Sequence, residues 1–238
     1  MAGIIGAIGA HGFGKTLCLT QVARGAARAG TRVRFVDQWR SFPAGAIYSS
    51  VGAYRAAVTK TGSIPRAVAF RPTEQGESEE GQELAVSVAE LVTEEEGGLL
   101  IIDEIDELVP PRKDLPKAIR RAALRGNRNP ETSFAWGTQY PFLIRASMRS
   151  QTDLLYVFRM TDEDSLKWLR KNLGAYGEEV AAAAPTLAKR EGFAVPLLLE
   201  GFGLLRFTLV AEPGDFAGRE LGLDIVHLDN DMLRSASL

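Results

Sequence analysis

The sequence predicts an α/β protein with a mostly parallel central sheet and helices on both faces. Short apolar segments alternate along the chain with longer segments of helical periodicity, which is the pattern of parallel strands joined by helices. Two of the apolar segments, 4–8 and 99–103, run into glycine-rich or acidic residues, as strands do where such sheets bind ligands. The 238 residues are 45% hydrophobic and 24% charged with a formal net charge of −2, so they suit one globular unit with an ordinary core.

Apolar segments of strand length predict the sheet. In chain order they lie at 4–8, 32–37, 67–71, 99–103, 133–138 and 153–159. Two further apolar segments, 193–199 and 203–210, predict a small C-terminal β-hairpin extension. We therefore expect residues 1–172 to form the core, and residues 173–238 to form a helix, the hairpin and a tail packed on it.

Apolar residues at helical spacing predict the helices between these strands. We expect them at 15–29, 52–60, 80–95, 113–126, 163–172 and 177–190, with a helical turn near 141–148. In the helix 80–95, for example, the acidic residues form a solvated face opposite Leu84, Val88, Leu91 and Val92. The region with Trp39, Phe42 and Tyr48, before the helix 52–60, is expected to be irregular, and 212–238 are expected to be a loop with a weakly ordered tail.

A phosphate-binding loop follows the first strand. The run Gly9, Ala10, His11, Gly12, Phe13, Gly14, Lys15, Thr16 matches GxxxxGK[ST] between an apolar strand and a helical pattern. In such a loop the backbone N–H groups cradle phosphates, the lysine reaches the β and γ phosphates, and the Thr16 hydroxyl binds Mg²⁺. The following helix directs its positive end at the same phosphates. The sequence therefore predicts binding of a nucleoside triphosphate, and the alternative is a glycine-rich turn with a solvated lysine.

Two carboxylates stand at the end of another predicted buried strand. Asp103 and Glu104 follow the aliphatic run 99–102. We expect Asp103 to hold Mg²⁺ and Glu104 to polarise a water that attacks the γ phosphate, which favours hydrolysis over transfer to a small acceptor. The alternative is that Glu104 and Asp106 only begin a solvated turn before Pro110.

A third polar group ends the strand 133–138. If this strand lies beside the phosphate-loop strand, Gln139 points at the γ phosphate or the attacking water and can report its presence to residues 140–150. The alternative is a glutamine that satisfies loop backbone groups.

Zinc sites and histidine-based triads are excluded, because the chain has two histidines and one cysteine. Cys18 is expected to be a small core residue.

Charge is segregated along the chain. An acidic stretch at 74–96 precedes a basic segment that could face a polyanion, with the solvated face of a helix as the alternative. The basic residues are Arg112, Lys113, Lys117, Arg120, Arg121, Arg125 and Arg128.

The order of these parts resembles the FtsK/HerA group of P-loop DNA translocases. The resemblance covers residues 4–172 and rests on the phosphate loop, Asp103-Glu104, the basic segment into Arg125-Gly-Asn-Arg128, Thr138-Gln139, and a strand ending in Phe158-Arg159. Within that group, the short genome-packaging ATPases of tailless icosahedral double-stranded DNA viruses are closest in size. The implied fold is a P-loop NTPase of the additional-strand, catalytic-glutamate type.

The resemblance also implies a function, cofactors and partners. It implies an ATP- and Mg²⁺-dependent motor that threads double-stranded DNA into a preformed capsid, working as a hexameric or pentameric ring with capsid vertex proteins as partners. Each active site would then receive an arginine from the neighbouring subunit, with Arg125 and Arg128 as first candidates and Arg145 and Arg149 as second. Lys113, Lys117, Arg120 and Arg121 would contact DNA phosphates in the pore.

Two other classes of function are open at this point. A small-molecule or nucleotide kinase would need an acceptor pocket and a mobile lid. A membrane-associated assembly or extrusion ATPase of a filamentous virus would imply a transmembrane helix, but no stretch reaches 18 uncharged apolar residues. The first strand begins too early to leave room for a signal peptide, so we expect a cytoplasmic protein, in the host cell or at the virion vertex, without stable membrane insertion.

Overall fold

The computed structural model describes residues 3–210 except 41, 43–45, 75–77, 96–97, 109–114, 126–131, 145 and 200, and it leaves aside the side chains of residues 123–125 and 132. The described strands form one sheet of nine, in the order β3-β4-β2-β5-β6-β1-β7-β8-β9. They are β1 (Ile4–Ile8), β2 (Val33–Val36), β3 (Ala46–Tyr48), β4 (Ala67–Phe70), β5 (Gly98–Ile102), β6 (Thr132–Thr138), β7 (Leu154–Val157), β8 (Glu191–Pro196) and β9 (Leu205–Thr208). Strands β1–β7 are parallel, whereas β7–β8 and β8–β9 pair antiparallel.

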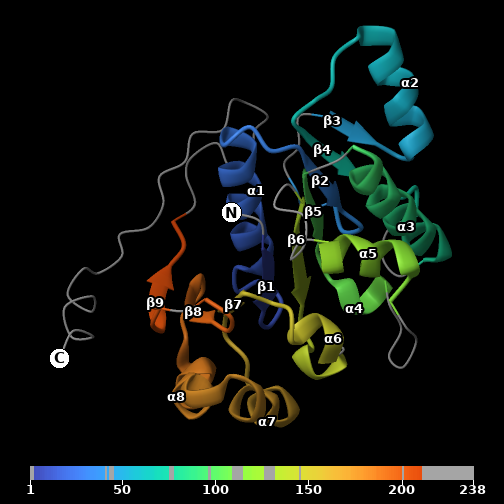
Figure 1. Ribbon diagram of the computed structural model, residues 1–238. Coiled ribbons are helices and arrows are strands. Elements are labelled where there is room, and N and C mark those ends of the chain that lie inside the picture. The colour runs from blue at the N-terminus through green and yellow to red at the C-terminus, as the bar shows by residue number, and fades with distance from the viewer. Residues whose placement is uncertain are drawn as a thin grey trace.

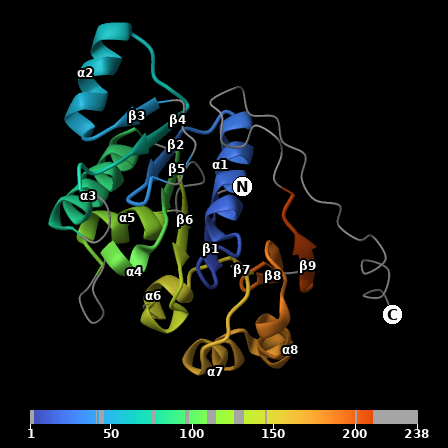
Figure 2. The same cartoon turned by 180° about the vertical axis from the view of Figure 1, so that it is seen from behind.

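Helices cover both faces of this sheet, as predicted. In Figure 1 the sheet is seen nearly edge-on, with α1 (Lys15–Arg28) on one side and α3 (Glu79–Glu94), α4 (Ile105–Leu108) and α5 (Lys117–Arg125) on the other. Figure 2 shows the same arrangement from behind. The remaining described helices are α2 (Val51–Thr61), α6 (Ala146–Arg149), α7 (Glu163–Asn172) and α8 (Gly177–Ala183).

Alternating strand residues build two cores. Leu100 and Ile102 of β5 join the cluster under α3, α5, α7 and α8, whereas Leu99 and Ile101 join the cluster under α1. Because successive side chains of a strand point to opposite faces, this alternation is what a sheet covered on both sides requires. Cys18 is a buried residue on the sheet-facing side of α1, as expected.

The strand order confirms the predicted type of P-loop fold. Strand β6 lies between the phosphate-loop strand β1 and the Asp103 strand β5, with parallel pairing to both. The additional strand therefore brings the ends of β1, β5 and β6 side by side at one edge. Strands β8 and β9 continue the same sheet as the predicted hairpin, and the division at residue 172 stays a prediction.

Three elements differ from the expectations. Strand β3 and helix α4 were not expected, and the helix 177–190 was wrong beyond Ala183. There the chain turns into a short 3₁₀ helix at Ala184–Thr186, because Pro185 has no N–H to continue the α-helical bonding. Residues 187–190 instead lead into β8. The expected ends of helix 113–126 and the expected tail 212–238 fall on residues outside the described ones. No helix in the described part of the chain is long and apolar enough to span a membrane.

Strand β2 carries a fully buried arginine. Arg34 of β2 has no exposed surface, and its Nη2 donates to Glu95 Oε1 at 2.8 Å and to the Tyr54 hydroxyl at 2.9 Å. The Tyr54 hydroxyl also donates to Glu95 Oε1, and burial raises the pKa of Tyr54 to about 12. A buried guanidinium is tolerated only when a carboxylate and hydrogen-bond acceptors surround it, so Glu95 is structurally required.

Neighbouring glutamates allow a matched test of this buried pair. Glu95→Ala should destabilise the protein by about 3 kcal/mol, because it leaves the Arg34 charge buried without its carboxylate. Glu94→Ala is the control, since its ion pair with Arg55 is exposed and should contribute less than about 1 kcal/mol. Urea unfolding monitored by circular dichroism measures both, and equal effects would contradict the assignment.

Candidate active site

The phosphate loop occupies the end of β1 and leads directly into α1. Gly9 and Gly14 have φ values of 153° and 125°, a backbone region that residues other than glycine rarely adopt. A Cβ on Gly9 would lie 2.6 Å from Phe158 Cβ, and a Cβ on Gly14 would lie 3.0 Å from the Phe158 ring. The loop thus needs glycine for its conformation and for its close packing on the end of β7.

Lys15, Glu104 and Gln139 meet at the mouth of this loop. Lys15 Nζ lies 3.2 Å from Glu104 Oε1, and the Gln139 amide donates to the same oxygen at 3.2 Å. Both charged side chains are nearly buried, with 4% and 8% of their surface exposed. Three groups that are far apart in the sequence therefore converge as predicted.

One alternative from the sequence does not hold. Glu104 does not begin a solvated turn, because it is buried and Ile105–Leu108 form the short helix α4. The Gln139 side chain donates to Glu104, and the Thr138 hydroxyl accepts the Tyr140 N–H. Glu104 also has a φ of 50°, a strained backbone conformation of the kind found at functional sites.

The two predicted metal ligands are in contact. The Thr16 hydroxyl donates to Asp103 Oδ2 at 2.5 Å, and Asp103 Oδ1 accepts the Glu104 N–H at 3.1 Å. Oδ1 also lies 2.3 Å from the position that a Cβ on Gly137 would occupy, so β6 must carry glycine there. Hydroxyl and carboxylate oxygens are the hard ligands that Mg²⁺ prefers.

The site contains a buried carboxylate oxygen that has no hydrogen-bond partner among the described residues. This atom is Glu104 Oε2, which is the position a water or ligand would satisfy. The described residues contain no group of three or more metal-binding side chains. Thr16 and Asp103 would therefore hold Mg²⁺ together with phosphate oxygens, rather than in a cage made by the protein.

The loop, the acids and Gln139 line one pocket of about 630 Å³. The polar or aromatic residues Trp39, Glu107, Lys189 and Arg190, which lie outside the sequence motifs, also line this pocket. The Trp39 indole donates to Glu107 Oε2 at 2.6 Å. Trp39 follows the end of β2, so the rule that ligands bind beyond strand ends could have indicated it. Nothing in the sequence pattern indicated Lys189 and Arg190, which were assigned to a helix.

The arginines proposed for a neighbouring active site do not line this pocket where they are described. Arg149 of α6 lies over the Trp168 ring, with its Cζ 5.8 Å from the ring centre. Arg125 belongs to α5 but its side chain is not described, and Arg128 and Arg145 lie outside the described residues. Their predicted role concerns a second subunit, so it stays a prediction.

Burial gives Asp103 an unusual titration. Desolvation, with a smaller contribution from the Glu104 charge, raises its pKa from 3.8 to about 6, against the opposing effects of the Thr16 hydroxyl and Lys15. A pKa raised on folding favours the protonated folded protein. The stability from this group is therefore fully present below pH 3.8 and is lost as pH rises through about 6.

Replacing this carboxylate should reverse that loss. In the metal-free protein, Asp103→Asn should gain on the order of 1–3 kcal/mol over the parent between about pH 4 and pH 7. Thermal unfolding across this pH range is the measurement. Asp164→Asn, at an exposed position of α7, is the matched control. The same pH trend in both variants would contradict the burial argument.

Known proteins resemble this chain in structure. Neither protein-family models nor curated protein sequences match it. The genome packaging NTPase B204 from Sulfolobus turreted icosahedral virus 2, in complex with AMPPCP, matches with a TM-score of 0.66 at 15% identity, over 88% of this chain and 98% of B204. VirB4 of Thermoanaerobacter pseudethanolicus matches at 0.64 and 11% identity, over 89% of this chain and 90% of VirB4. The pCW3 conjugation coupling protein TcpA matches at 0.57 and 14% identity, over 87% of this chain and 60% of TcpA. The chain therefore has the fold of the FtsK/HerA-type P-loop ATPases.

Proposed function

We propose that this protein is a Mg²⁺-dependent ATPase that translocates double-stranded DNA. More specifically, we propose that it is a viral genome-packaging motor. The observation that carries the ATPase activity is the convergence of Lys15, Glu104 and Gln139 beside Thr16 and Asp103. A phosphate-binding lysine, a metal-binding pair and a carboxylate with one unsatisfied buried oxygen are what hydrolysis of a terminal phosphate requires.

The ion pair between Lys15 and Glu104 defines the resting state of the site. A triphosphate brings negative charge that competes for the Lys15 ammonium, which frees Glu104 Oε1 from its partner. Mg²⁺, held by Thr16 and Asp103, would supply charge neutralisation of the phosphates. Glu104 then accepts a proton from water as the water oxygen bonds to the γ phosphorus and the bond to the β-phosphate oxygen breaks.

Gln139 gives the site a connection to the rest of the subunit. Its amide donates a hydrogen bond to Glu104 in the resting state. A movement of the Glu104 carboxylate would therefore change this bond and the position of Gln139 at the end of β6. From there the chain runs through residues 140–150, which include α6. We propose that this segment transmits the presence of the γ phosphate.

The DNA part of the proposal rests on similarity and on charge. The structural neighbours include a protein named as a genome packaging NTPase. Helix α5 buries Ile119 and Ala122 and exposes Lys117, Arg120 and Arg121, so its basic face is free to contact phosphates in the described part of the chain. Lys117 and Arg121 line a pocket together with Glu90 and Glu94 of α3. These carboxylates lower the positive charge of this part of the surface.

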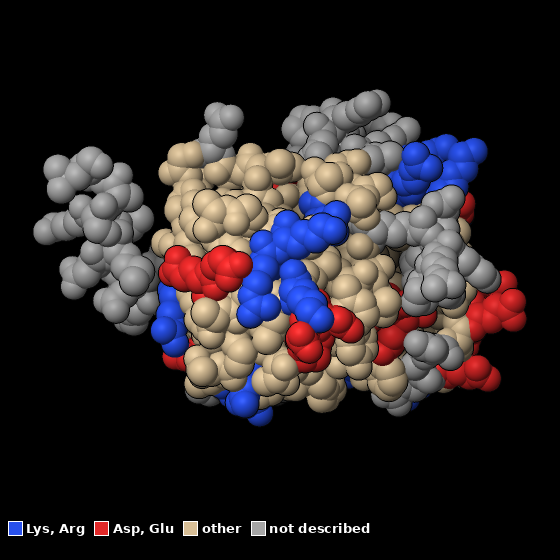
Figure 3. All heavy atoms as spheres, turned by 90° about the horizontal axis from the view of Figure 1, so that it is seen from below, with Lys and Arg blue, Asp and Glu red and all other residues tan. Residues whose placement is uncertain are grey.

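The lower face of the molecule is a weaker candidate for DNA. Figure 3 shows basic and acidic side chains mixed on that face. On α7, Lys167 pairs with Glu163 at 3.0 Å and Arg170 with Glu178 at 3.5 Å. Paired charges of this kind give little net attraction to a polyanion.

A ring of subunits, hexameric or pentameric, with capsid vertex proteins as partners, completes the proposal. Within it, Arg125, Arg128, Arg145 and Arg149 are the candidates that reach a neighbouring active site. No described feature favours the kinase or the membrane-extrusion alternative over this one.

The roles of Lys15 and Glu104 predict two different losses. Lys15→Ala should abolish productive ATP binding, whereas Glu104→Gln should keep ATP binding and reduce hydrolysis at least about 100-fold, because proton acceptance from water is lost. Binding of a fluorescent ATP analogue and release of phosphate measure the two effects separately. Equal turnover in Glu104→Gln and the parent would exclude Glu104 as the base.

Helix α5 predicts how DNA stimulates hydrolysis. Replacing Lys117, Arg120 and Arg121 together by Ala should reduce stimulation by double-stranded DNA and flatten its salt dependence, because phosphate contacts are lost. The matched control is the replacement of Lys167, Arg170 and Lys171 of α7 by Ala. Equal loss in the two triple variants, or none in the first, would remove α5 from the DNA surface.

An arginine that acts across subunits predicts rescue by mixing. Each of the four candidate arginines is changed to Ala, and these subunits are mixed with Lys15→Ala subunits. ATPase activity should partly return only for the arginine that completes a neighbour's site, because a mixed interface then contains one intact set of groups. The absence of rescue for all four would contradict a shared site.

A further inference from the structure

We propose that Lys189 and Arg190 bind the α-phosphate end of the nucleotide, so that the C-terminal β-hairpin supplies part of the active site of its own subunit. This inference rests on the proposed nucleotide binding and concerns two residues outside every motif described above. It is carried by the position of the two residues in the pocket, by the anchoring of Arg190 and by the charge of the pocket.

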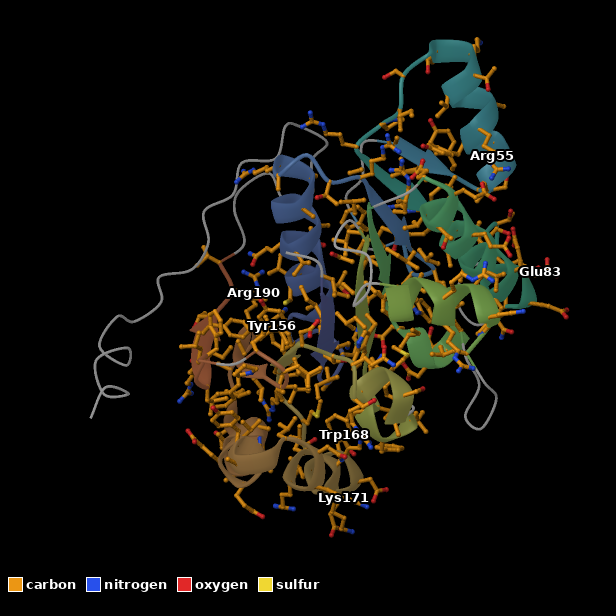
Figure 4. All side chains as sticks on the ribbon, viewed as in Figure 1. Arg55, Glu83, Tyr156, Trp168, Lys171 and Arg190 are labelled. Atoms are coloured by element: carbon orange, nitrogen blue, oxygen red, sulfur yellow. The ribbon has the colours of Figure 1, made fainter. Side chains whose placement is uncertain are left out.

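The position follows from the strand order. Asp103, Glu104 and Gln139 reach the pocket from β5 and β6, on one side of the phosphate-loop strand β1. Lys189 and Arg190 reach the same pocket from the opposite side, where β7 and β8 lie. Figure 4 places Arg190 beside α1, on the side of the hairpin.

The two ends of a bound triphosphate are fixed by the same geometry. Lys15, Glu104 and Gln139 define where the γ phosphate lies. The remaining phosphates run along the loop and the start of α1, away from β5 and β6. Their path leads to the side of Lys189 and Arg190, so these two residues meet the α phosphate rather than the γ phosphate.

The backbone of Arg190 is fastened to the phosphate loop. Its N–H donates to the Phe13 carbonyl at 3.0 Å, and its own carbonyl accepts the Leu209 N–H from beyond β9 at 2.9 Å. Its φ of 71° is unusual for a residue with a side chain. Such a conformation persists only where the surroundings hold it, and it is enriched at binding sites. A Cβ on Gly14 would lie 3.4 Å from Arg190 Cα, so the contact with the loop is close.

Two of the basic side chains that line the pocket form no ion pair with the described residues. Among the described lining residues, three are acidic, Asp103, Glu104 and Glu107, and three are basic, Lys15, Lys189 and Arg190. Lys15 is already engaged with Glu104, whereas the described residues form no ion pair with Lys189 or Arg190. A guanidinium and an ammonium are the side chains best suited to phosphate oxygens.

Binding of ADP and ATP, together with turnover, tests the proposal. The double variant with Lys189→Ala and Arg190→Ala should weaken ADP and ATP binding by the same factor, at least about tenfold, because both ligands carry the α phosphate. The turnover at saturating ATP should change by less than about threefold, since the reacting γ phosphate is elsewhere. Arg190→Lys should recover part of the affinity, which a purely structural role of the backbone would not explain.

Arg206→Ala is the matched control. Arg206 belongs to the same hairpin, and it pairs at 3.4 Å with Glu191 and is 53% exposed, so its loss should leave ADP affinity unchanged. Unchanged ADP affinity in the double variant overturns the proposal while leaving the ATPase function intact. A loss of turnover with normal ADP affinity also overturns it, because the residues would then act at the γ phosphate. If the parent protein binds no ADP, the proposed function itself fails.

Discussion

The nearly buried ion pair between Lys15 and Glu104 is the interaction on which the rest of the site depends. One ammonium neutralises a glutamate whose neighbour, Asp103, is also buried. Burial raises the pKa of Asp103 because it penalises the charged carboxylate, and the negative charge of Glu104 adds to this effect. In the proposed mechanism a bound nucleotide would compete with Glu104 for Lys15, and Asp103 with Thr16 would hold the metal ion.

The sheet is built to make this meeting possible. Strand β6 separates β1 from β5, so the phosphate loop and the Asp103-Glu104 pair are two strands apart and leave space between them. Gln139 at the end of β6 occupies that space and bonds to Glu104. Gly137, two residues before Gln139 in the chain, has no room for a Cβ because Asp103 lies against it. Strand β6 therefore supports the site in two ways. Gln139 makes the contact with Glu104, and Gly137 leaves the space that the Asp103 carboxylate occupies.

Much of this could be predicted from the sequence, because the motifs are local and strand ends are easily recognised. The loop, Asp103-Glu104, Gln139 and the C-terminal hairpin were placed correctly for that reason. Trp39, Lys189 and Arg190 were missed, since they reach the pocket through long-range packing that no local pattern encodes. Arg34 was missed as well, because a charged residue within a strand gives no sign of a buried partner 61 positions away. The error at 177–190 was avoidable, as Pro185 is visible in the sequence.

The most direct test of the central claim is a structure of the protein with Mg²⁺ and a non-hydrolysable ATP analogue. The account predicts that Lys15 Nζ contacts the β and γ phosphates and has left Glu104, whose carboxylate faces a water in line with the γ phosphorus. Gln139 should move with it. A structure in which the analogue is bound but Lys15 still pairs with Glu104, or in which Gln139 lies away from the γ phosphate, would contradict the account.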